Sequence, residues 1–170
     1  MLTSDLYKIY GALGKVIQTR IFLAFFFNFY NLYVFLDHGY YNLHIDTTTP
    51  KIGDVINRSE TSLITIKYYE QVDLTPDYNV TIIQDDGSIN GIIRQVASVS
   101  DDGNNNFVTI SDDGTTINIT VINSTFNQPG GKYYISIDKG FVRDRKYQEP
   151  LIGINTNVWS FTTRRCSIKF

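Results

Sequence analysis

The chain has 170 residues, of which 14% are aromatic and 19% charged, with a net charge of -2. This length fits one domain with extensions. Residues 46–163 hold 15 Asp and Glu against 9 Lys and Arg, a net of -6. Nucleic-acid binding needs a positively charged face, so we expect no nucleic-acid partner. The single cysteine, Cys166, rules out a disulfide within the chain.

Residues 1–45 are expected to form an extension separate from the domain. Its apolar run, residues 21–36, would span about 24 Å as a helix, short of the bilayer core of about 30 Å. Lys8, Lys15 and Arg20 precede the run and Asp37 follows it. This arrangement suits a signal peptide or signal anchor, with membrane attachment through residues 21–36. The alternative interpretation, an upstream fragment without a packed structure, stays open.

The domain is predicted to begin after a linker at residues 47–50, because proline and β-branched residues favour an extended chain. A first edge strand is expected at residues 51–57. Residues 62–69 form the clearest early strand, since Ile64, Ile66 and Tyr68 share one face and alternate with Leu63, Thr65 and Lys67 on the other.

Two hairpins follow, each marked by aspartates before a glycine. Strands at residues 79–84 and 91–99 flank the sequence DDGS, and strands at 107–111 and 115–122 flank DDG. Glycine supplies the positive φ that such turns require.

The last third contains two aromatic strands joined by a long loop. Tyr133, Ile135 and Ile137 share one face of the first strand, and Trp159 and Phe161 share one face of the last. The loop at residues 144–157 is the least predictable part. Strands at roughly ten-residue spacing, without helical periods between them, predict an all-β antiparallel sandwich of seven to eight strands over residues 46–163. A basic tail, residues 164–170, follows.

Three segments carry a family resemblance. LITIKYYEQVD at residues 63–73, KYYISIDKGFVRD at 132–144 and VWSFTT at 158–163 resemble the bacterial Ig-like domain of the SbsA type, found in surface-layer and adhesin-like proteins. The loop departs from the family, because it lacks the usual Gly-Asn pair. The resemblance implies an Ig-like β-sandwich that acts as a spacer or adhesive repeat beside neighbouring repeats, without enzyme activity.

Residues for catalysis are not grouped in the sequence. The only histidines, His38 and His44, precede the domain, and Cys166 follows it, so no nucleophile lies near a base. They are interpreted as solvated linker residues. The pairs Asp85-Asp86, Asp101-Asp102 and Asp112-Asp113 all precede glycine and are interpreted as turn residues. We expect no catalytic residue and no cofactor.

Calcium is the one metal ion for which the sequence offers candidate ligands, and we expect that it is not bound. Asp101, Asp102, Asn104 and Asn106 lie in one loop and supply the oxygen ligands that calcium prefers. Asp112 and Asp113 lie in the next loop, which a sandwich places at its opposite end.

Four glycosylation sequons point to the secretory route, at Asn57, Asn79, Asn118 and Asn123. Asn118 is expected to face solvent, because its neighbours Ile117 and Ile119 point inward.

The sequence therefore predicts a non-enzymatic module of a cell-surface or secreted protein, working as a spacer or in adhesion to a surface protein or glycan. The alternative is a glycan- or peptide-binding module that uses solvent-facing tyrosines, Tyr69 and Tyr134, on a sheet face.

Overall fold

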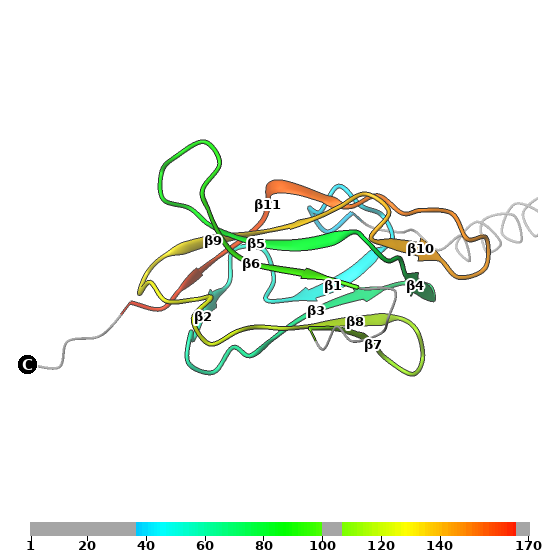
Figure 1. The fold of residues 1–170 in the computed structure, drawn as a ribbon, viewed down its shortest axis with the longest axis horizontal. Coiled ribbons are helices and arrows are strands. Elements are labelled where there is room, and N and C mark those ends of the chain that lie inside the picture. Colours follow the sequence, from blue (N-terminus) through cyan, green and yellow to red (C-terminus); the bar gives the residue numbers. More distant parts are fainter. Residues whose placement is uncertain (1–36, 100–106, 166–170) are drawn as a thin grey trace, which may run out of the picture. The chain divides into compact units, whose positions relative to one another are not determined.

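Two mainly antiparallel sheets face each other across a shared apolar core (Figure 1). The structure, a computed structural model, describes residues 37–99 and 107–165. The chain divides into two compact units between Val34 and Phe35, and all described residues belong to the second. None of the described residues forms a helix able to cross a membrane, and the apolar run 21–36 lies outside them.

The first sheet has four strands in the order β1 (Ile45–Thr49), β3 (Leu63–Tyr68), β8 (Thr116–Thr120) and β7 (Val108–Ile110). The second sheet has five, in the order β2 (Val55–Ile56), β11 (Ile154–Thr163), β9 (Lys132–Ile137), β5 (Asn79–Gln84) and β6 (Ile92–Ser98). A separate pair joins β10 (Val142–Asp144) to β4 (Val72–Leu74). Neighbouring strands are antiparallel except β2 and β11, which run parallel.

This strand order is that of an Ig-like sandwich. β1, β3, β8 and β7 occupy the places of strands A, B, E and D, while β11, β9 and β5 occupy those of G, F and C. β6 extends the second sheet beyond β5, as strand C′ does in variable-type domains. At the start of β9, the Tyr133 hydroxyl accepts a 3.2 Å hydrogen bond from the backbone N–H of Gln128. This contact is equivalent to the tyrosine corner of Ig-like domains.

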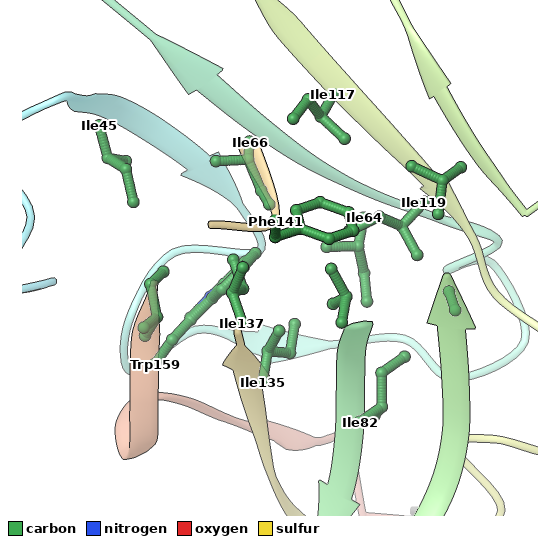
Figure 2. Packing of buried hydrophobic residues seen from close by; sticks show 14 of the residues in the cluster. Ile45, Ile64, Ile66, Ile82, Ile117, Ile119, Ile135, Ile137, Phe141 and Trp159 are labelled. Atoms are coloured by element: carbon green, nitrogen blue, oxygen red, sulfur yellow. The ribbon is translucent and has the colours of Figure 1, made fainter. Parts of the chain in front are cut away.

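The core is filled by alternate residues of both sheets, without a disulfide. Figure 2 shows Phe141 beside Ile64 and Ile66 of β3, with Ile137 of β9 and Trp159 of β11 nearby. An aromatic group lies at the β9–β11 side, where Phe126 meets Tyr133 and Phe161 edge-on at 5.1 and 5.5 Å between ring centres. Such pairs add about 0.5–1.5 kcal/mol beyond the area they bury.

The predicted hairpins and strand faces are confirmed. β5 pairs with β6, and β7 with β8, across the two Asp-Gly turns. Ile64, Ile66 and Tyr68 are buried, as are the inward residues Tyr133, Ile135, Ile137, Trp159 and Phe161.

The predicted linker at residues 47–50 is wrong. Thr47, Thr48 and Thr49 belong to β1 and pair with β3, because three β-branched residues suit a strand better than a linker. Tyr40 and Ile45 are also buried, so the folded body includes residues placed in the extension. The expected strand at 51–57 shrinks to the two residues of β2.

The number of strands also differs from the expected seven to eight. The described residues form eleven strands, which include β1, β4 and β10, none of which was expected. β4 and β10 have three residues each and pair with each other although they lie far apart in the sequence. Strands this short do not show a clear alternation of apolar and polar residues. The loop expected at 144–157 is shorter than predicted, because β10 ends at Asp144 and β11 already begins at Ile154. An isolated bridge joins Arg143 to Pro150.

Candidate interaction surface

The two candidate tyrosines lie on different sheets. Tyr69 follows β3 in the four-stranded sheet, and Tyr134 lies in β9 of the five-stranded sheet. Both are half-buried. The hydroxyl of Tyr69 lies 2.8 Å from Nε2 of His38, and the hydroxyl of Tyr134 donates to Oδ2 of Asp85. The structure therefore does not bring these two tyrosines into one aromatic surface.

The sequon asparagines differ in exposure. Asn123 is exposed, whereas Asn57, Asn79 and Asn118 are half-buried. Nδ2 of Asn79 donates a 3.2 Å hydrogen bond to Oδ2 of Asp138, and Oδ1 of Asn57 accepts one of 3.0 Å from Ser59. Asn118 lies in β8, where both neighbours Ile117 and Ile119 are buried, so its side chain faces outward as expected. Asn123 is the sequon with the most room for a glycan.

The calcium candidates Asp101, Asp102, Asn104 and Asn106 lie outside the described residues. Asp113, in the next loop, accepts hydrogen bonds from Oγ of Ser111 at 2.5 Å and from the backbone N–H of Thr115 at 2.9 Å. Within residues 37–99 and 107–165, no three acidic, histidine or cysteine side chains are grouped so as to hold a metal ion.

The aspartates of the turns are held by hydrogen bonds that favour their charged form. Asp86 accepts bonds from the hydroxyl and backbone N–H of Ser88, which lower its pKa. The Ser111 hydroxyl lowers the pKa of Asp113 in the same way. These contacts match the turn role expected for Asp85-Asp86 and Asp112-Asp113.

The histidines expected in a linker have contacts within the folded body. His38 is exposed and bonded to Tyr69, and it lines a surface hollow of about 330 Å³ with Tyr40, Asp46 and Lys51. His44 lines a second hollow of about 240 Å³, beside Glu70, Tyr147 and Glu149. Cys166 lies outside the described residues.

The most unusual surface feature is the outer edge of the five-stranded sheet. Ile89 in the β5–β6 turn is 99% exposed, and Ile93 and Val96 of β6 are 64% and 50% exposed. Ile92 is exposed as well. We call these four residues the aliphatic edge. Because an edge strand has unpaired backbone groups, aliphatic side chains beside it mark a surface suited to association.

Gln95 anchors this edge to the other sheet. Its Nε2 donates to the carbonyl oxygen of Thr120 at 2.8 Å. Its Oε1 accepts from the backbone N–H of Ile122 at 3.0 Å and from the hydroxyl of Thr125 at 2.8 Å. Since Gln95 is buried, these three bonds fix the position of β6 against the β8–β9 connection.

The sequence prediction found the strand at 91–99 but not its exposure. A bulge in β6 places Ile93 opposite Ile83 and Gln95 opposite Ile82, which breaks the regular alternation. The signal in the sequence was the adjacent pair Ile92-Ile93, since a half-buried strand would show one apolar residue in two.

No protein-family model, curated protein or solved structure matches the chain. The fold class therefore stands on the strand order and packing described above.

Proposed function

We propose that the chain provides a non-enzymatic Ig-like module of a cell-surface or secreted protein, related to the bacterial SbsA-type domains, and that it works in adhesion or as a structural spacer. The observation that carries this proposal is the aliphatic edge, because a group of exposed aliphatic side chains marks a site where a protein contacts another molecule.

The interior supports a structural role as well. Within the described residues, every buried side-chain nitrogen or oxygen has a hydrogen-bond partner. The largest fully buried side chains are aromatic or isoleucine. Such an interior gives rigidity, which a spacer or an adhesive module needs, and the resemblance of residues 63–73, 132–144 and 158–163 points the same way.

The second candidate is glycan or peptide binding, now favoured at a different tyrosine. Tyr147 is 65% exposed and lines the 240 Å³ hollow with Glu70 and Glu149. An aromatic face beside carboxylates suits a sugar, because the ring stacks on its C–H groups while the carboxylates accept from its hydroxyls. Binding of the full chain to a glycan array, lost in Tyr147→Ala and kept in Tyr78→Ala, would favour this candidate.

The proposed location is tested on intact cells that express the full chain. A membrane-impermeant amine label should reach the exposed lysines, among them Lys51 and Lys139, before lysis. If the sequons are used, a glycosidase should lower the apparent mass, and Asn123→Gln should remove part of that shift. A chain labelled only after lysis would contradict the surface location.

A further inference from the structure

The backbone groups of Val96 point away from the sheet. The carbonyl oxygen of Asn79 accepts from the N–H of Asp138, and the N–H of Asp85 donates to Lys132, so odd-numbered residues of β5 face β9. Alternation then turns Val80 and Ile82 toward β6, where their partners are Ala97 and Gln95. The N–H and C=O of Val96, between those partners, face outward.

Within the described part of the chain, no strand pairs with this outer side of β6. Natural edges are protected by charged side chains, above all Lys, by Pro or by bulges, and β6 contains neither Lys nor Pro. Its bulge lies at the start of the strand, before Gln95. The one charged residue, Arg94, is turned aside, since its guanidinium donates to the carbonyl oxygens of Ser124 and Thr125 at 2.6 and 3.3 Å.

We propose that β6 pairs antiparallel with β6 of a second copy of this chain, with the two-fold axis at Val96. The occupant of such an edge must be an extended strand, because only a strand can satisfy its row of backbone donors and acceptors.

The charge pattern of β6 favours its own copy as that strand. With the axis at Val96, each Arg94 lies opposite Ser98 of the other copy, so the like charges are not paired. Val96 then lies opposite its own equivalent, which gives an aliphatic cross-strand pair.

The pairing joins the two five-stranded sheets into one continuous sheet across the dimer. It goes beyond the proposed adhesive role, and its failure would leave that role intact, since binding to a different protein or glycan needs no second copy.

Cysteine cross-linking of the full chain tests the pairing. Directly opposed residues in a hydrogen-bonded antiparallel pair have Cα atoms about 5.5 Å apart, within the range that a disulfide bridges. Val96→Cys in a Cys166→Ser background should therefore form a disulfide-linked dimer under mild oxidation. Ile152→Cys in the same background is the matched control, because Ile152 is exposed to a similar extent but lies in the connection between β10 and β11, outside β6. It should stay monomeric.

A second measurement covers non-covalent association. In light scattering, Val96→Lys should have a smaller mass than the unchanged chain at the same concentration. Ile152→Lys should have the same mass as the unchanged chain. Both variants should keep the thermal midpoint of the unchanged chain. The proposal is overturned if Val96→Cys remains monomeric, or if Ile152→Cys forms as much dimer. It is also overturned if Val96→Lys and the unchanged chain have the same mass.

Discussion

The indole nitrogen of Trp159 donates a buried 2.9 Å hydrogen bond to the carbonyl oxygen of Pro50, 109 residues earlier in the chain. The Thr48 hydroxyl donates to the same oxygen at 2.8 Å. The ring of Tyr40 meets the indole edge-on at 6.1 Å, and burial raises the pKa of this tyrosine. The last strand is thereby fixed to the end of β1 and the residue that follows it.

Replacing this tryptophan tests that connection. Trp159→Phe loses the hydrogen bond and part of the buried ring, although the Pro50 oxygen keeps its bond from Thr48. We expect the free energy of unfolding to fall by about 1–3 kcal/mol. Urea unfolding followed by circular dichroism measures it. Ser160→Ala, at the neighbouring half-buried position, should change the stability by much less, and an equal loss would contradict this account.

Gln95 should contribute more to the stability of the domain than its polar side chain suggests. Gln95→Leu fills similar space but leaves the Thr120 carbonyl and the Ile122 N–H without their side-chain partner, at a cost of about 2–4 kcal/mol. Gln95→Glu retains an acceptor for Ile122 and loses only the donor to Thr120. The loss of stability caused by Gln95→Glu should therefore be smaller at low pH, because the protonated carboxyl can again donate to the Thr120 carbonyl oxygen. Urea midpoints of both variants at pH 7 and pH 4 give the comparison, and an unchanged midpoint for Gln95→Leu would refute the role of this side chain.

Acid should destabilise the domain through Asp85. The Tyr134 hydroxyl, and next the Gly87 N–H, lower the pKa of this carboxyl from its usual 3.8. A lowered folded-state pKa contributes stability above the unfolded pKa of about 4, and that stability is lost as the pH falls through the folded pKa. Tyr134→Phe removes the first donor, so the drop in thermal midpoint between pH 7 and pH 3 should be smaller than in the unchanged chain. An identical drop would exclude the Asp85–Tyr134 bond as a source of acid sensitivity.

Gly153 should tolerate no side chain. A Cβ at this position would lie 1.9 Å from the carbonyl oxygen of Ile137 and 2.7 Å from the carbonyl carbon of Asp138. Because both neighbours are backbone atoms, Gly153→Ala must displace β9 or β11, and we expect a loss of several kcal/mol, about 2–5.

Gly87→Ala is the matched control for that substitution. Its φ of +83° strains an alanine, but no atom lies within 4 Å of the added carbon, so the expected loss is about 1 kcal/mol. Thermal unfolding ranks the two variants, and a smaller effect at Gly153 would contradict the close approach of Gly153 to the end of β9.

The parts of the fold that the sequence predicts are those with local signals. The Asp-Gly turns at residues 85–87 and 112–114 identify both hairpins, and strict alternation identifies the inward faces of β3 and β9. β4 and β10 are missed because three-residue strands carry no period and pair across about 70 residues of chain. β1 is missed because Pro50, directly after it, was taken to mark a linker.

The candidate surface is harder to predict, since exposure depends on which strand lies at the edge. Strand order follows from long-range pairing of β5 with β9 and of β9 with β11, which one sequence does not reveal. Alternation alone predicted that Tyr69 and Tyr134, which are both half-buried, point away from the core, but it carried no information that they lie on different sheets.

The adhesive role is tested most directly by a bead-clustering assay with the full chain. Beads coated with the chain are mixed with uncoated beads, with beads coated with the Val96→Lys variant, and with beads or cells that carry candidate surface proteins and glycans. The account predicts clusters that contain coated beads, either with one another or with one of the candidate partners, and fewer of them when the aliphatic edge carries a lysine. Coated beads that stay dispersed with every partner and with one another would contradict it.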